Sequence, residues 1–253
     1  MSDQVVYGNT LLNGVNKAGH LTADANGYYT VVLGALGVEN SAGEVYTDTT
    51  QSRQTFEQNG TLMRRISQGL LRGEYGHPDP ADHPNYMAFE RRVRMIKEDR
   101  VSHHISKVWL DKVEHNGTTV MGILGKVKPS GPYGEALREA LQNPEENVTF
   151  SGRYYSNVSV KGGKRHREIH TVGTWDYVSE PGIAMASKYH SPSLESHGDL
   201  KLDEAMLEQA VAFEDTHREL AVSMESSGML ARELMGELGF SRKRLKSRKS
   251  MQW

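Results

Sequence analysis

The stretch between residues 149 and 178 constrains the fold most, because two strand-like runs flank a pair of glycines. From Tyr154 to Val160 successive side chains alternate between two faces, which is typical of a half-buried β-strand. The sequence KGGK at 161–164 supplies a two-residue glycine turn, and residues 165–178 return as a second strand. This stretch therefore predicts a long β-hairpin.

The register of this hairpin brings a serine and a carboxylate onto one face. With the glycines in the turn and no bulge, Ser151 lies opposite Thr174, and Asp176 is a diagonal neighbour of Ser151 at about 7–8 Å. An imidazole fits between side chains at that separation, and a histidine that links a serine to a carboxylate is the arrangement of serine hydrolases. The alternative is structural, because a glycine within a strand pattern, here Gly152, usually marks a bulge.

The histidine must come from another part of the chain, and two clusters supply candidates. His77 and His83 lie in GHPDPADHP, and His103 and His104 lie in VSHHI. A metal site formed by His77, His83 and the aspartates between them is a second interpretation, because imidazole and carboxylate ligands suit zinc or manganese. No recognisable ligand spacing supports that interpretation.

The composition excludes several classes of protein. There is no cysteine, which excludes disulfides, thiolate metal sites and cysteine nucleophiles. The chain has no apolar run long enough for a membrane span and begins without a signal-peptide pattern, so we expect no membrane association and a cytoplasmic location. A net charge of −2 gives no overall attraction to nucleic acid. Only the basic run at 241–250 could bind DNA weakly or an acidic protein, and such a run is also typical of a solvated chain end.

The first part of the chain predicts an α+β fold. Strands are expected at 100–109 and 118–128 in addition to the hairpin, and a turn with a short helix is expected between residues 129 and 147. Spaced apolar residues predict a helix over 52–71. These elements favour a mostly antiparallel β domain at 1–190.

The last part of the chain has a different character. From residue 193 onward it is rich in alanine, leucine, glutamate and methionine, which predicts a long helix or a helix pair with a break at Gly228. We therefore expect a helical segment with a basic tail at 191–253.

Four segments, in this order along the chain, resemble motifs of one protein family. They are VENSAGEVYT (38–47), LRGEYGHPD (71–79), VSHHISKVWLD (101–111) and NVTFSGRYYS (147–156). Together they resemble the prohead core serine proteases of tailed phages, which are related to herpesvirus assemblin. A fifth segment, GTWDYVSEPGIA (173–184), is similar to a lesser degree. The resemblance implies a β-barrel-like protease core surrounded by helices.

The resemblance implies roles for particular residues. Ser151 would be the nucleophile, His77 the general base and Asp176 the residue that orients the histidine. Gly152 stands where the family has a second serine, which leaves Ser151 as the nucleophile of the motif. Gly152 and Arg153, with the backbone N–H groups at these positions, are candidates for an oxyanion hole.

The third member of the triad has two further candidates, His103 and Glu74, because the related assemblins use a second histidine in that place. His103 would equally suit a hydrogen-bonded core histidine, and Glu74 would suit a turn cap or an ion pair with an arginine. Thr47 departs from the family pattern, which has proline at that position.

The function that the resemblance implies is that of a serine endopeptidase, acting through an acyl-enzyme and needing no metal or organic cofactor. Its substrates would be scaffold and major capsid proteins, cleaved after glutamate inside the immature prohead in the host cytoplasm. The helical segment would carry the enzyme to the scaffold core of the prohead. A homo-oligomer is compatible with the sequence.

Two short repeats suggest self-cleavage. SLES (193–196) and SMES (223–226) place Glu195 and Glu225 before a serine, outside the segments that resemble the family. Cleavage there would separate the protease from its helical segment. An ordinary linker and an exposed helix face are the alternatives.

Two other classes of function stay open. One is a non-enzymatic scaffold or capsid component with a protease-like fold, which would be expected to have lost Ser151 or His77; the chain has both. The other is a metal-dependent hydrolase built on His77 and His83.

Overall fold

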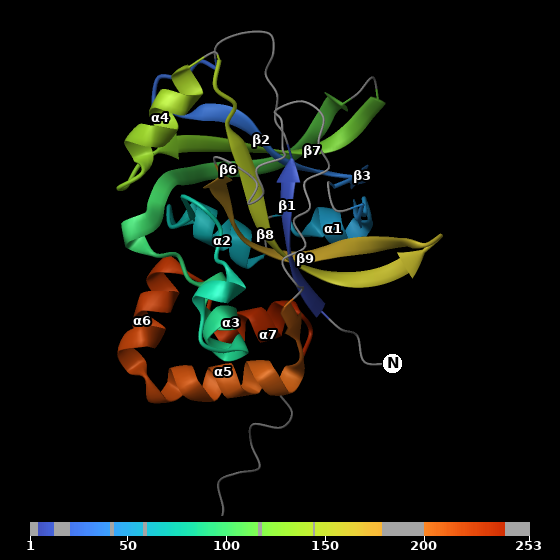
Figure 1. Ribbon diagram of the computed structural model, residues 1–253, viewed down its shortest axis with the longest axis vertical. Coiled ribbons are helices and arrows are strands. Elements are labelled where there is room, and N and C mark those ends of the chain that lie inside the picture. Colours follow the sequence, from blue (N-terminus) through green and yellow to red (C-terminus); the bar gives the residue numbers. More distant parts are fainter. Residues whose placement is uncertain are drawn as a thin grey trace, which may run out of the picture.

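The computed structural model describes residues 5–12, 21–40, 43–57, 60–115, 118–143, 145–178 and 200–240 (Figure 1). For residues 5–12 the backbone alone is described. Within these ranges the chain forms a six-stranded sheet, in the order β10-β1-β8-β9-β4-β3, and a four-stranded sheet, in the order β2-β7-β6-β5. Paired strands are antiparallel except β4 and β9. The predicted α+β fold with a mostly antiparallel core is therefore confirmed.

The elements have the following bounds. The strands are β1 Val5–Leu12, β2 Tyr29–Leu36, β3 Val38–Glu39, β4 Val45–Tyr46, β5 Arg72–Glu74, β6 Val101–His115, β7 Thr118–Pro129, β8 Thr149–Lys161, β9 Lys164–Val178 and β10 Leu200–Leu202. The helices are α1 Thr50–Gln54, α2 Thr61–Ser67, α3 Tyr86–Arg94, α4 Gly134–Gln142, α5 Glu204–Thr216, α6 Arg218–Ser227 and α7 Ala231–Glu237, with short 3₁₀ turns η1 Pro80–Asp82 and η2 Glu98–Arg100.

The β8–β9 hairpin forms as predicted, with a register that differs near its base. Gly162 and Gly163 have φ values of 58° and 78°, the left-handed conformation that a two-residue hairpin turn requires at both positions. The pairs run without a shift from Lys161↔Lys164 to Ser156↔Ile169, and two irregularities follow. Each adds one residue to β9, as β-bulges do. Ser151 consequently lies opposite Asp176, and the predicted pairing with Thr174 is wrong.

The segment expected as one helix over 52–71 contains two short helices. The Thr49 side chain accepts a hydrogen bond from the Ser52 backbone and begins α1, which ends at Gln54. A second helix begins after Gly60. The single-helix prediction is wrong because a glycine interrupts the apolar pattern and provides a new helix start.

The main apolar core joins the two sheets. It contains Leu33 of β2, Ile105 of β6, Val127 of β7, Phe150 of β8 and Trp175 of β9, all nearly inaccessible to solvent. Because side chains alternate along a strand, the neighbours of Phe150 and Trp175 point to the other face of the large sheet. Ser151 and Asp176 occupy that other face.

A second apolar core connects the C-terminal helices to α3. It consists of Phe89 and Val93 of α3, Tyr155 of β8, Leu200 and Leu202 of β10, Met206, Leu207, Ala210 and Val211 of α5, and Met229, Ala231, Leu234 and Met235 in and near α7. In Figure 1, α3 lies against α5–α7 at one end of the molecule, and β10 pairs with β1. Gly228 ends α6, as the predicted break requires. The predicted domain boundary after residue 190 lies outside the described residues.

The described helices are all too short or too polar to cross a lipid bilayer.

Candidate active site

The turn after β5 carries His77 to the end of β9. Tyr75 forms an isolated bridge with Tyr177, and the Gly76 backbone N–H donates to the Tyr177 carbonyl at 2.8 Å. Gly76 has a φ of 75°, which a residue with a side chain rarely adopts. This tight turn places His77 beside Asp176, the neighbour of Tyr177 in β9.

At this point of the large sheet, Asp176 has His77 and Ser151 as neighbours. His77 Nδ1 lies 2.8 Å from Asp176 Oδ2, and Ser151 is the cross-strand partner of Asp176. Asp176 and Ser151 are fully buried, and the His77 side chain is 11% exposed. Ser151 Oγ and His77 Nε2 are both buried and have no hydrogen-bond partner among the described residues. The structure thus brings together the three residues that the sequence nominated from distant segments.

The hydrogen bond to Asp176 determines the tautomer of His77. An ionised carboxylate only accepts hydrogen bonds, so Nδ1 carries the proton and donates it. In the neutral ring Nε2 is then a free acceptor, suited to take a proton.

The carboxylate of Asp176 has four donors around it. Oδ2 accepts from His77 Nδ1 and from Arg153 Nε at 2.7 Å. Oδ1 accepts from Arg153 Nη2 at 2.9 Å and from the Glu74 backbone N–H at 3.0 Å. Burial by itself would raise the pKa of Asp176, but the charge of Arg153 and the hydrogen bond from His77 outweigh it and hold that pKa well below its ordinary value. Asp176 is therefore ionised at neutral pH.

The guanidinium of Arg153 is bound to the carboxylate of Asp176, so the N–H groups that bind it are not available to an oxyanion. The side chain is fully buried, and its remaining donors reach the Val93 and Met95 carbonyls at 3.2 and 2.9 Å. Gly152 has a packing reason to lack a side chain, because a Cβ there would lie 2.3 Å from the Tyr154 ring. An oxyanion role for the backbone N–H groups of Gly152 and Arg153 stays a prediction.

Neither Glu74 nor His103, the two other candidates for the third member of the triad, is the residue bonded to the His77 ring. The buried Glu74 carboxylate pairs with Arg92 and accepts from the Lys97 backbone N–H at 2.6 Å. His103 is fully buried, and its Nδ1 lies 2.8 Å from the hydroxyl oxygen of Ser102. The carboxylate bonded to His77 is that of Asp176.

Arg92 and the end of α3 belong to the network around the site, and the sequence did not nominate them. Arg92 Nη1 donates to Glu74 Oε1 at 3.0 Å and to the Met95 carbonyl at 3.0 Å. The run ERRVR (90–94) reads as a solvated charge cluster, so composition alone offers no sign that two of its arginines are buried.

The histidines proposed for a metal site have separate surroundings. His77 is bonded to Asp176, and the His83 ring lies beside Phe89 with centroids 5.8 Å apart. Asp79 caps η1 by accepting from the Ala81 backbone N–H at 2.8 Å. In the parts of the chain that the structure covers, no three histidine, aspartate or glutamate side chains gather as metal ligands would. The geometry therefore offers no donor set for that interpretation.

The structure describes one of the two self-cleavage candidates, Glu225. Glu195 and the basic run at 241–250 lie outside the described residues. Glu225 is exposed on α6, where the Ser226 hydroxyl donates to the Ser223 carbonyl at 2.9 Å. A protease would have to unwind this part of α6 to cleave after Glu225.

Buried His103 makes the folded protein sensitive to acid. Burial lowers its pKa from 6.5 to about 4, although the charge of Asp176 opposes the shift. Between these two values the unfolded chain binds a proton that the folded chain does not, so stability falls as the pH falls. We expect a loss of about 3 kcal/mol from this residue between pH 7 and pH 4, measured by urea unfolding.

The control is His103→Gln, which cannot titrate. The depressed pKa of Asp176 affects stability only below about pH 5, where its unfolded-state carboxyl begins to protonate, and both proteins share this contribution because both keep Asp176. Parallel loss of stability in wild type and His103→Gln between pH 7 and pH 4 would contradict the assignment.

The chain is similar to proteins of known families. The Peptidase S80 family matches residues 7–235. The capsid maturation protease of Pseudomonas phage phiKZ is 39% identical over 204 residues, which are 78% of this chain and 74% of that protein. Among solved structures, the capsid assembly protease of bacteriophage T4 aligns with 70% of this chain and 96% of its own, at 14% identity and a TM-score of 0.39. The family match contains Ser151, His77 and Asp176.

Proposed function

Because the chain belongs to the Peptidase S80 family, we propose that it is a serine endopeptidase that processes scaffold and capsid proteins during maturation of a phage prohead. One observation carries the serine mechanism. His77 is held by a buried carboxylate with its Nε2 left as an acceptor, and Ser151 lies across the strand pair from that carboxylate.

The proposed reaction proceeds through an acyl-enzyme. Ser151 Oγ attacks the scissile carbonyl carbon while His77 Nε2 takes its proton. Asp176 stabilises the imidazolium that forms and keeps Nδ1 protonated. His77 then gives its proton to the leaving amine, and water hydrolyses the ester by the same route. Ser151 Oγ has no hydrogen-bond partner among the residues that the structure describes, as catalytic hydrogen bonds frequently form only when substrate binds.

Cleavage after glutamate is part of the proposal. The acidic side chain before the scissile bond needs a cation or hydrogen-bond donors, but Arg153 is committed to Asp176. Arg165 and Arg167 are both paired with Glu44. The glutamate specificity therefore rests on the family resemblance rather than on an assigned side chain.

The proposed place of action is the interior of the immature prohead in the host cell. The relative from phage phiKZ is named a capsid maturation protease, and we expect the substrates of the present protein to be capsid and scaffold proteins as well. The C-terminal helices and the basic run at 241–250 are the proposed contact to the scaffold.

The deciding experiment compares wild type with Ser151→Ala and Ser156→Ala. Ser156 is a matched control, because it lies on the same strand, is fully buried, and its hydroxyl also lacks a hydrogen-bond partner among the residues that the structure describes. Each variant is co-expressed with the scaffold and capsid proteins, and fragments are identified by intact mass. We expect cleavage after glutamate in wild type and in Ser156→Ala, and none in Ser151→Ala.

Two other results would replace the proposal. Cleavage that survives Ser151→Ala and stops with a chelator would establish a metal-dependent hydrolase. Absence of cleavage in all three proteins would indicate a non-enzymatic scaffold or capsid component.

A further inference from the structure

We propose that Arg153 is the positioning residue of the site, holding the carboxylate of Asp176 in the orientation that His77 needs. Glu74 and Arg92 extend this arrangement into a buried row of alternating charges. The inference rests on the proposed function, in which Asp176 orients His77, and adds residues that neither motif spacing nor resemblance assigned to this role.

The geometry at Asp176 leaves its carboxylate one orientation. Arg153 binds it with two parallel bonds, Nε to Oδ2 and Nη2 to Oδ1, and this fork is the strongest and most directional pairing a carboxylate makes. The Glu74 backbone N–H holds Oδ1 as well. Rotation of the carboxylate would break these bonds, so the lone pair of Oδ2 that remains is directed at His77.

Arg153 is itself held at every donor. Its Nη1 donates to the Val93 and Met95 carbonyls, and its Nη2 lies 3.2 Å from Glu74 Oε2. With the two bonds to Asp176, all five N–H groups of the guanidinium have an acceptor. A lysine in this place has one ammonium group and cannot span Asp176, Glu74 and α3 together.

Glu74 belongs to the row of alternating charges through both its backbone and its side chain. Its carboxylate is bound by Arg92 through both terminal nitrogens and by the Lys97 backbone N–H. Two carboxylates and two guanidinium groups therefore alternate in the interior, with no net charge while His77 is neutral. Such pairing limits the cost of burying ions.

This arrangement has a consequence for catalysis. Among the described residues, His77 and Arg153 bond to the carboxylate of Asp176, and His103 lies near enough to sense its charge. The Glu74 carboxylate is paired with Arg153, and the Glu74 backbone N–H is the group that reaches Asp176. Arg153 and His77 both lower the pKa of Asp176, which burial would otherwise raise, and the charge of Arg153 is the largest single effect that lowers it. If Arg153 is replaced, Asp176 should turn away from His77 and protonate more readily.

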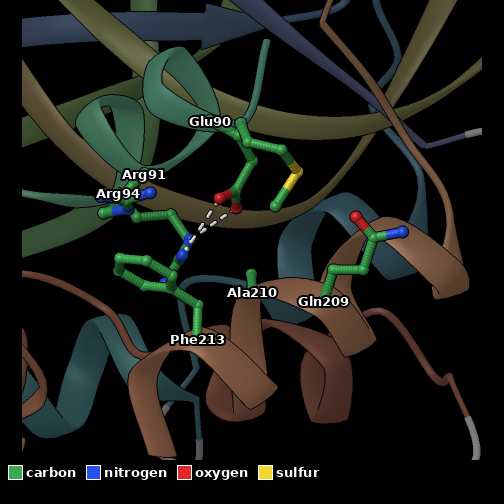
Figure 2. A pocket seen from close by; sticks show the side chains of 7 residues that line it. Glu90, Arg91, Arg94, Gln209, Ala210 and Phe213 are labelled. Carbon is green, nitrogen blue, oxygen red and sulfur yellow. Dashed lines mark hydrogen bonds and ion pairs between the residues drawn. The ribbon is translucent and has the colours of Figure 1, made fainter. Parts of the chain in front are cut away.

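Arg94 provides a matched control for a buried arginine without this role. It is 1% exposed and forms a two-point ion pair with Glu90 on the same helix as Arg92. Figure 2 shows this pair beside Ala210 and Phe213 of α5, and Arg94 also donates to Glu214 at 2.7 Å. Arg94 has no contact with Asp176, so Arg94→Lys disturbs a buried ion pair of similar geometry and leaves the catalytic carboxylate alone.

The test uses the full chain and compares Arg153→Lys with Arg94→Lys. We expect both to lower the thermal midpoint. Arg153→Lys should also lower kcat by about 100-fold with little change in KM, because the base is displaced rather than the substrate. The acid limb of its kcat/KM profile should move to lower pH by about one unit, because an Asp176 that has turned away no longer stabilises the protonated form of His77. Arg94→Lys should keep the wild-type kcat and acid limb.

A second readout does not need activity. The Nδ1 proton of His77, bonded to a buried carboxylate, should give a far-downfield proton NMR resonance in Ser151→Ala protein, identified by its absence in His77→Gln. We expect Arg94→Lys to keep this resonance and Arg153→Lys to shift or lose it. If wild-type cleavage does not depend on Ser151, the proposed function fails, while this resonance still decides the positioning role.

Two results would overturn the inference. One is an Arg153→Lys protein with the wild-type resonance and acid limb, and the other is equal kcat loss in the two lysine variants. If Arg153→Lys does not fold, Arg92→Lys replaces it, with an expected several-fold fall in kcat and a smaller shift of the acid limb in the same direction. An Arg92→Lys protein with unchanged kcat and acid limb then refutes the proposed row of alternating charges.

Discussion

Replacing Asp176 with asparagine is expected to lower kcat by about 10⁴-fold and to destabilise the fold by about 3–5 kcal/mol. The substitution preserves the shape of the side chain but turns one acceptor oxygen into a donor NH₂ group. Two N–H donors point at each oxygen of Asp176, so either orientation of the amide brings donors against donors. Single-turnover cleavage and urea unfolding measure the two effects.

The loss of stability follows from Arg153 rather than from the triad. In Asp176→Asn the guanidinium keeps its buried position and loses its main counter-ion, and an uncompensated buried charge is far more costly than an absent pair. The loss of rate follows from His77, whose Nδ1 would no longer face a carboxylate that can stabilise the imidazolium.

Asp79→Asn is the matched control. Asp79 lies two residues after His77 and caps η1 through the Ala81 backbone N–H, a role that asparagine fills equally well. We expect wild-type cleavage and a change in stability below about 0.5 kcal/mol. An Asp176→Asn protein that resembles this control would show that Asp176 belongs neither to the triad nor to the charge network.

The sequence predicted the hairpin, with Ser151 and Asp176 on one face of it, better than it predicted the register. Alternation and the two turn glycines indicate the strands, but the bulges depend on how β9 fits its neighbours. Gly173 lies at the second bulge, and a glycine in a strand pattern is the available sign of such a site. The shift in register replaces the predicted diagonal relation by direct cross-strand pairing of Asp176 with Ser151, and His77 reaches the carboxylate from the turn after β5.

The pairing of His77 with Asp176 could come only from the resemblance. These residues are 99 positions apart, and no periodicity connects a turn after β5 to the end of β9. The bridge between Tyr75 and Tyr177 brings them together, and this tertiary contact has no sign in the local sequence.

Helix α3 and its buried arginines were missed for a different reason. Asn85 caps the helix by accepting from the Ala88 backbone N–H at 2.9 Å, and Phe89 and Val93 lie four apart on its buried face. Arginines between these positions hide the apolar stripe, because arginine normally indicates a solvated face. Their carboxylate partners, Glu74 and Glu214, become visible only in the fold.

A chain ending at Glu195 is expected to lose both its fold and its protease activity. The deletion removes β10, which pairs with β1, and the helices α5–α7. It would remove Leu207 and Leu234 from the second apolar core and would expose Phe89, Val93 and Tyr155 to solvent. Each such apolar side chain contributes about 1.5–3 kcal/mol, so several together exceed the stability of an ordinary domain.

Loss of Glu214 adds an electrostatic cost to this truncation. Arg94 donates to Glu214, whose carboxylate also accepts from the Ala231 backbone N–H at 3.0 Å. Without Glu214, Glu90 is the carboxylate partner that Arg94 keeps. Loss of Glu214 therefore adds to the destabilisation of the truncated chain.

The contrast between deletion and self-cleavage makes this expectation testable. A chain ending at Phe240 lacks residues 241–253, which include the basic run, and should stay soluble and cleave peptides normally, whereas the chain ending at Glu195 should aggregate. If the protein cuts itself after Glu195 or Glu225, the fragments should stay together on size-exclusion chromatography, because the contacts of β10, α5 and α7 do not need the cut bond. A soluble, active chain ending at Glu195 would instead make the C-terminal segment a separable appendage, and its packing against α3 would then be dispensable for the fold.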